Sequence, residues 1–175
     1  MKRPLLLIVV AVLALTPVAC SAEHESGAAG GGEGAVVDHI ADGDTLELES
    51  GDRVRLVQID ATELGPSECY SEEAMDALEE LAPPGTRVRL EADPGLDQVD
   101  RYGRLLRYVR VGDRNVNLEL VRRGAAAPYF FHGEHGKYAL ELENAGEAAR
   151  DMGRGMWGAC RVAWNPERSA TAQPR

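Results

Sequence analysis

The stretch that most constrains this chain runs from Ala41 to Glu63, where acidic residues flank alternating strand residues. Asp44 opens one predicted strand, and Asp60 closes the next, over residues 53–60. A Gly-Asp pair between the strands is a two-residue hairpin signal. Pairing through that turn brings both carboxylates to the open end of the hairpin. Carboxylate oxygens gathered in this way suit a hard divalent cation, although an acid at a strand end is also a common solvated turn residue.

The rest of the chain reads as further short strands and three helices. Strands are predicted over residues 35–40, 44–49, 53–60, 86–90 and 105–111. Helices are predicted from Ser71 to the Pro-Pro-Gly stop at 83–85, from a cap at Asn117 to Gly124, and from Tyr138 to Met152. Five strands with three helices, the first helix inserted between strands three and four, predict an α+β fold with a five-stranded OB-type β-barrel.

The N-terminal region reads as an export signal followed by a tether. A short apolar run after two basic residues predicts a signal peptide over residues 1–19, and residues 20–34 are a Gly- and acid-rich linker. Cys20 resembles the lipidated cysteine of bacterial lipoproteins, so the protein is expected on the outer face of the cell membrane or, without the lipid, secreted. The folded domain is predicted over residues 35–160, and residues 161–175 as a C-terminal tail.

Two cysteines remain in the exported part of the chain, Cys69 and Cys160. An even pair in an oxidising compartment predicts a disulfide. Metal binding by two cysteines without a nearby histidine pair is the poorer alternative.

The charge of the chain is unevenly distributed. The formal net charge is −10, which is unusual for a nucleic-acid binder. Residues 101–123, however, carry seven arginines against two acids. A local basic face of this kind can hold phosphate on an acidic protein, whereas most of these arginines can equally be solvated residues of a strand and a helix.

Five motifs in series are similar to the staphylococcal nuclease (thermonuclease) family in order and spacing, over roughly residues 35–160. They are Asp44-Thr45; Arg55-Leu56 with Asp60 and Glu63; Asp100-Arg101-Tyr102-Gly103-Arg104; Val116-Asn117; and Gly155-Met156-Trp157-Gly158. The resemblance implies the same barrel that the pattern of elements predicts.

The resemblance also implies a calcium site. Asp44 and Asp60 would ligate Ca²⁺ through carboxylate oxygens, and Ala61 through its main-chain carbonyl. The family often has threonine where this chain has Ala61, but a carbonyl ligand does not depend on the side chain.

Three further residues match catalytic positions of the family. Arg55 and Arg104 match its two catalytic arginines, and Glu63 matches the carboxylate that orients or deprotonates the attacking water. The alternative for Arg55 is a strand arginine paired with a cross-strand acid such as Glu47 or Glu49. The alternative for Arg104 is a turn residue after a glycine.

Substrate contacts follow from the same resemblance. Arg101 and Tyr102 match positions that hold a terminal phosphate. Tyr129 lies where an aromatic ring stacks on the base, but the preceding segment is one residue shorter than in the founding enzyme. Phe130 and Phe131 therefore compete with Tyr129 for that role.

These features together predict a monomeric, exported, calcium-dependent nuclease that hydrolyses DNA and RNA, prefers single strands and leaves 3′-phosphate ends. Two rival interpretations remain open at this point. One is an OB-type module that binds nucleic acid without cleaving it, and the other is a lipoprotein in which calcium serves only stability.

Overall fold

The computed structural model describes residues 33–63, 65 and 68–175. The predicted signal peptide, the candidate lipidation site Cys20 and nearly all of the predicted tether lie outside the described residues. Within the described residues, no helix is long and apolar enough to span a membrane.

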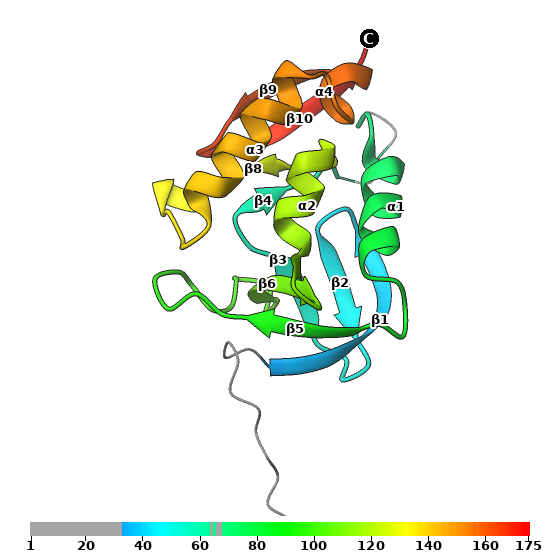
Figure 1. Ribbon diagram of the computed structural model, residues 1–175, viewed down its shortest axis with the longest axis vertical. Coiled ribbons are helices and arrows are strands. Elements are labelled where there is room, and N and C mark those ends of the chain that lie inside the picture. Colours follow the sequence, from blue (N-terminus) through cyan, green and yellow to red (C-terminus); the bar gives the residue numbers. More distant parts are fainter. Residues whose placement is uncertain (1–32, 64, 66–67) are drawn as a thin grey trace, which may run out of the picture.

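The centre of the fold is a closed barrel, which has five strands in the described part of the chain (Figure 1). The strands are β1 (Glu33–Asp42), β2 (Thr45–Leu48), β3 (Arg53–Leu56), β5 (Arg87–Glu91) and β6 (Leu105–Val111). Neighbours are antiparallel in the order β3-β2-β1-β5-β6, and a parallel pairing of β3 with β6 closes the barrel. The two-residue strand β7 (Arg114–Asn115) pairs antiparallel with the end of β6. The barrel confirms the predicted OB-type α+β fold.

The helices in the described residues are α1 (Ser71–Leu81), α2 (Val116–Arg123), α3 (Ala139–Asp151), the short α4 (Met156–Ala159) and the 3₁₀ turn η1 (Phe131–Gly133). Helices α1 and α2 pack against the outside of the barrel, α3 packs against α2 and β8 (Ala127–Pro128), and α4 packs against β9 (Cys160–Asn165). Helix α1 buries Ala74, Leu78 and Leu81, the apolar stripe that its sequence predicts. The barrel interior and this stripe form one apolar core.

The predicted strand over residues 53–60 is broken in the structure. It ends as β3 at Leu56 and resumes as β4 (Ile59–Asp60), which pairs with β8 (Ala127–Pro128) rather than with the barrel. The break lies at Gln58, which has a positive φ of 65° that non-glycine residues seldom adopt. The kink directs Asp60 away from the barrel wall and toward the C-terminal part of the chain.

The predicted helix cap at Asn117 is wrong. Helix α2 is capped by Asn115, whose side chain accepts a hydrogen bond from the main-chain N–H of Leu118. Asn117 is fully buried inside the helix. Its Oδ1 accepts from the N–H of Val109 at 3.0 Å and its Nδ2 donates to the carbonyl of Val57 at 2.9 Å. Asn117 therefore joins α2 to β6 and to the β3–β4 kink.

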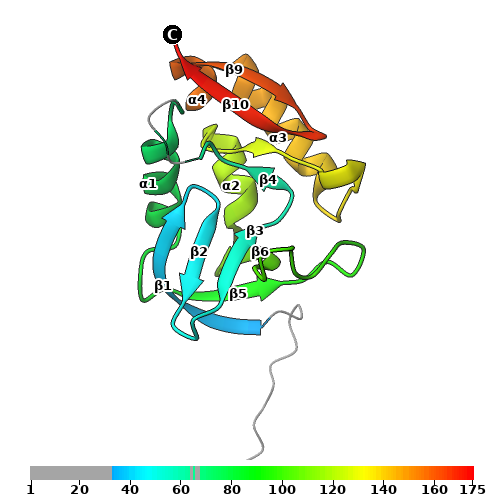
Figure 2. The same ribbon diagram turned by 180° about the vertical axis from the view of Figure 1, so that it is seen from behind.

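The predicted C-terminal tail is also wrong. Residues 160–174 form a hairpin of β9 (Cys160–Asn165) and β10 (Arg168–Pro174). Figure 2 shows this hairpin beside α3, beyond β4 and β8. Trp164 Nε1 donates to the carbonyl of Pro128 at 2.9 Å, and the N–H of Cys69 donates to the carbonyl of Ala172 at 3.0 Å. The hairpin is thus packed onto the domain through a second apolar cluster.

The structure contains the predicted disulfide between Cys69 and Cys160, which are 91 residues apart in the sequence. Closing a loop of this length restricts the unfolded chain. We expect the double variant Cys69→Ser/Cys160→Ser to lose roughly 4–5 kcal/mol in the free energy of unfolding. Urea unfolding followed by circular dichroism measures this loss. Titration of two free thiols in the native wild-type protein would contradict the bridge.

Candidate active site

Asp44 is buried in the turn that links β1 to β2, directly before the first residue of β2. Both of its carboxylate oxygens are held: Oδ2 accepts from the N–H of Ala61 at 2.9 Å, and Oδ1 accepts from Thr45 Oγ1 at 3.1 Å. The close approach depends on Gly43, because a Cβ there would lie 2.7 Å from the Cβ of Ala61 and 2.8 Å from that of Ala74. The glycine in this motif is therefore a packing requirement.

Arg55 lies at the centre of the site. Its Nη2 is 2.9 Å from Asp44 Oδ2 and 2.9 Å from Asp60 Oδ1. Its Nη1 donates to the main-chain carbonyls of Leu56 at 2.8 Å and Ile59 at 2.7 Å. The kink after β3 supplies the second carbonyl, so the break in the strand helps to fix the guanidinium group. A planar fork of donors is suited to such a position.

The alternative partners expected for Arg55, Glu47 or Glu49, are not its partners in the structure. Thr45 is its cross-strand neighbour, and Glu47 instead pairs with Arg53 at 3.1 Å. Arg55 thus points into the acidic site rather than across the exposed sheet surface.

Asp60 is held from two sides. Its Oδ1 meets Arg55, and its Oδ2 accepts from the main-chain N–H of Ala170, on β10, at 3.0 Å. Burial raises the pKa of Asp60, while Arg55 acts in the opposite direction. Burial likewise raises the pKa of Asp44 to about 7, with Arg55 lowering it and the neighbouring charge of Asp42 raising it further.

The site has an excess of negative charge. The carboxylates of Asp44, Asp60, Asp42 and Glu63 all act electrostatically on the single guanidinium group of Arg55. Because the carboxylates outnumber the guanidinium group and supply hard oxygen donors, the site suits a divalent cation such as calcium. No group of three or more His, Cys, Asp or Glu side chains in the described part of the chain forms a metal cage by itself. Main-chain oxygens such as that of Ala61, water or substrate would have to complete the coordination.

Glu63 follows β4 by three residues and is exposed to solvent. Its charge raises the pKa of both Arg55 and Asp60. A carboxylate on the solvent side of the buried pair is placed where a water molecule can reach it.

Arg104 joins the site from the start of β6. Its Nη1 donates to Thr45 Oγ1 at 3.4 Å, and its Nε is 2.6 Å from Asp100 Oδ2. Asp100 Oδ1 also accepts from the N–H groups of Tyr102 and Arg104. Burial tends to raise the pKa of Asp100, but these donors lower it below its ordinary value. Asp100 therefore builds the turn that presents Arg104, a role that the sequence pattern did not assign.

Arg101 and Tyr102 lie at the exposed rim, next to Arg104. Tyr102 is 68% exposed. The guanidinium carbons of Arg101 and Arg104 lie 4.7 and 5.5 Å from its ring centre, and Arg101 Nη2 donates to its hydroxyl. The two arginines and the ring form a continuous surface that can receive a phosphate and its nucleoside.

The structure narrows the choice of stacking residue. Phe130 is fully buried, whereas Tyr129 is half-buried and Phe131 is 53% exposed. The N–H of Tyr129 donates to the carbonyl of Gln58, whose side-chain amide also binds the carbonyl of Glu134 at 2.6 Å. Gln58 therefore anchors the aromatic loop beside β4, and Tyr129 and Phe131 remain as candidates.

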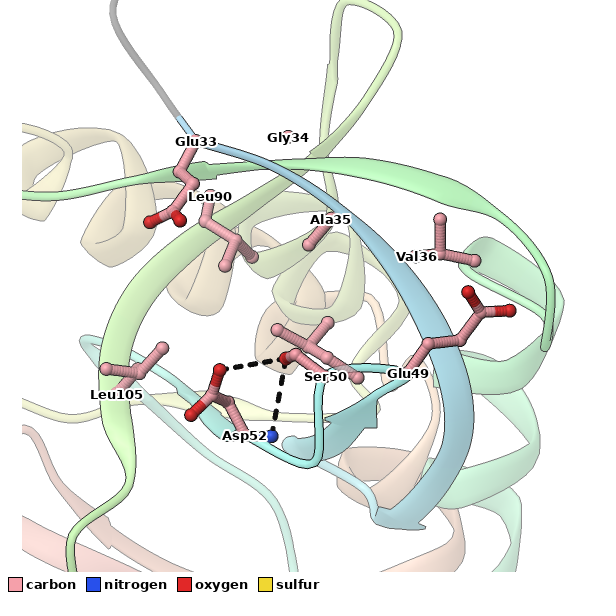
Figure 3. Close-up of a pocket in the computed structure, with 10 residues that line it drawn as sticks. Glu33, Gly34, Ala35, Val36, Glu49, Ser50, Asp52, Leu90 and Leu105 are labelled. Carbon is pink, nitrogen blue, oxygen red and sulfur yellow. Dashed lines mark hydrogen bonds between the residues drawn. The ribbon is translucent and has the colours of Figure 1, made fainter.

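A pocket of about 280 Å³ lies at the other end of the β2–β3 hairpin (Figure 3). Glu33, Glu49 and Asp52 line it, and Ser50 Oγ donates to Asp52 Oδ2 at 2.8 Å. Acidic side chains at its rim disfavour phosphate. The candidate active site is instead the cluster of Arg55, Asp44 and Asp60, with Glu63 and Arg104 beside it.

The fold and the site define the class of protein: an α+β protein with an OB-type barrel, carrying carboxylates and arginines at one end. The comparison with known sequences identifies the family, because the profile described as Staphylococcal nuclease homologue matches residues 53–159. The chain belongs to the staphylococcal nuclease family. Both Asp44 and the β9–β10 hairpin lie outside the matched residues.

Similar proteins include the thermonuclease of Staphylococcus intermedius, which is 32% identical over 133 residues, or 72% of this chain and 77% of that protein. The SPbeta prophage-derived endonuclease YokF of Bacillus subtilis is 32% identical over 128 residues, covering 69% of this chain and 43% of that protein. The endonuclease YncB of Bacillus subtilis is 31% identical over 128 residues, covering 69% of this chain and 60% of that protein.

Proposed function

We propose that this member of the staphylococcal nuclease family is a calcium-dependent nuclease that hydrolyses DNA and RNA, prefers single strands and leaves 3′-phosphate ends. Membership of the family makes the chain a phosphodiester hydrolase. The observation that carries the proposal is the contact between Arg55 and two buried carboxylates, Asp44 and Asp60, beside the exposed Glu63.

Phosphodiester cleavage builds negative charge on the phosphate oxygens. Arg55 and Arg104 approach the same carboxylate, Asp44, one directly and the other through Thr45. Two guanidinium groups so held can stabilise that charge by paired hydrogen bonds, and they remain charged at any physiological pH. Because the protein holds both guanidinium groups in place before the substrate binds, the two arginines need to move little during the reaction.

Glu63 is the group that orients or deprotonates the attacking water. It is exposed, so a water molecule can reach its carboxylate. Asp44, Asp60 and the Ala61 carbonyl would hold the calcium ion, which when bound supplies Lewis-acid stabilisation of the phosphate.

The exposed rings around the site support the preference for single strands. Tyr102 and Phe131 are more than half exposed. Exposed rings can stack on unpaired bases of any sequence, whereas bases inside a duplex are not accessible to them. We further propose that the protein acts outside the cell, either secreted or held to the membrane surface by a lipid on Cys20, where nucleic-acid substrate would be free DNA or RNA.

Metal removal tests the proposal. Purified protein is incubated with denatured DNA, duplex DNA or RNA, first with calcium and then with excess chelator. We expect cleavage of the denatured DNA and RNA with calcium, slower cleavage of the duplex, and only background cleavage with chelator. End-labelling then identifies 3′-phosphate termini.

Other outcomes would support the rival functions. Binding of denatured DNA without cleavage would identify a non-catalytic nucleic-acid module. A calcium-dependent rise in melting temperature without any effect on nucleic acid would identify a structural calcium site. Cleavage that persists in chelator would refute the calcium requirement.

A further inference from the structure

The C-terminal hairpin reaches the centre of the candidate active site, although it lies beyond the residues matched by the family profile. The N–H of Ala170 donates to Asp60 Oδ2 at 3.0 Å. Arg55 holds the other oxygen of the same carboxylate. The orientation of Asp60 is thus set jointly by the barrel and by a segment 110 residues away in the sequence.

A bulge in the hairpin places this N–H group. Arg168 lies opposite Asn165 and Thr171 lies opposite Ala163, which leaves one more residue on β10 than on β9 between these pairs. Ala170 is one of the residues in that bulge. Bulges of this kind turn main-chain groups out of a ladder and are common beside active sites. Here the N–H group donates to the carboxylate of Asp60, a residue that is 6% exposed.

Several contacts fix the hairpin against the site. The disulfide joins β9 to Cys69, at the end of the loop that carries Glu63, and the N–H of Cys69 donates to Ala172. Trp164 donates to Pro128, which belongs to the strand paired with β4. Ala170 and Ala172 are buried in the apolar cluster beneath the hairpin. The hairpin therefore cannot shift without disturbing the surroundings of Asp60.

We propose that the β9–β10 hairpin belongs to the active site. In it, Ala170 is a positioning residue: its main-chain N–H holds the Asp60 carboxylate in the orientation that binds calcium. The inference rests on the proposed function in taking Asp60 as a metal ligand. It adds a structural element that the family match does not include. A hydrogen bond to a charged carboxylate is strong enough for its loss to change calcium affinity about tenfold.

The test replaces the amide of Ala170 by an ester, by incorporating lactic acid at this position. The ester removes the N–H and retains the methyl side chain. The matched control is an ester at Gln173, an exposed residue of the same strand. We expect the Ala170 ester to raise the Kd for calcium about tenfold in calorimetry without substrate, and to lower kcat more than it raises KM.

Intrinsic fluorescence monitors whether the hairpin stays docked. The two tryptophans of the chain, Trp157 on α4 and Trp164 on β9, lie with ring centres 5.5 Å apart. Their emission and the melting temperature should be the same in the two esters. A purely structural role of Ala170 would change these signals and leave the calcium Kd at the control value.

The inference is overturned if the Ala170 ester binds calcium within twofold of the Gln173 ester, or if the wild-type protein binds no calcium. A wild-type protein that binds calcium but cleaves nothing would refute the proposed nuclease and leave the inference supported by the Kd values.

Discussion

Replacing Arg55 by lysine should lower kcat about a thousandfold on denatured DNA with calcium present. Lysine keeps the positive charge between Asp44 and Asp60 but cannot make the four contacts that the guanidinium group makes with two carboxylates and two carbonyls. Lysine is preferred to methionine because an uncharged side chain would leave two buried carboxylates unpaired, which costs about 3–5 kcal/mol.

The control for this variant is Arg53→Lys. Arg53 lies on the same strand but is exposed and pairs with Glu47, away from the site. It should retain the wild-type rate. Steady-state kinetics and thermal unfolding of both variants are needed, and a folded Arg55→Lys protein with a rate close to that of wild type would exclude the assigned role of Arg55.

Replacing Glu63 by glutamine should lower kcat by about 10²–10⁴-fold and change KM little. Glutamine has nearly the same shape but cannot accept a proton. Since Glu63 is exposed, the fold should tolerate the change, and the removal of one negative charge from the surroundings of Asp60 should not destabilise the protein.

The matching control is Glu72→Gln, which removes the same charge from an exposed position in the first turn of α1. Single-turnover rates separate the chemical step from substrate binding. If Glu63→Gln and Glu72→Gln cleave at the same rate, another group must activate the water.

The sequence predicts those parts of the structure that depend on local patterns. The hairpin of β2 and β3 forms where the Gly51-Asp52 signal lies, although residues 49–52 link the strands instead of the two residues expected, and α1 stops before Pro83. The disulfide follows from counting cysteines. The spacing of the motifs also indicates which residues belong together, because Asp44, Arg55 and Asp60 lie on adjoining strand ends.

The features that escape prediction depend on contacts distant in the sequence. In residues 53–60 the apolar positions shift from Val54 and Leu56 to Val57 and Ile59. One strand with apolar residues on both faces explains this pattern equally well, so the pattern alone does not give the positive φ of Gln58 or the pairing of β4 with β8. The residues of β10 are small and polar, a composition typical of an unstructured tail. The strand forms because the disulfide and the apolar cluster beneath it stabilise the hairpin. No local sequence pattern predicts the hydrogen bond from the N–H of Ala170 to Asp60.

The parallel pairing of β3 with β6 also affects how the protein folds. It places Arg55 opposite Leu106, so that Arg104 meets the β2–β3 hairpin only once two segments some fifty residues apart have joined. Such non-local pairings form late because the intervening chain must first be ordered. A partly folded chain whose barrel is still open would contain both halves of the site but would be inactive. The return of nuclease activity during refolding would therefore measure the rate of barrel closure.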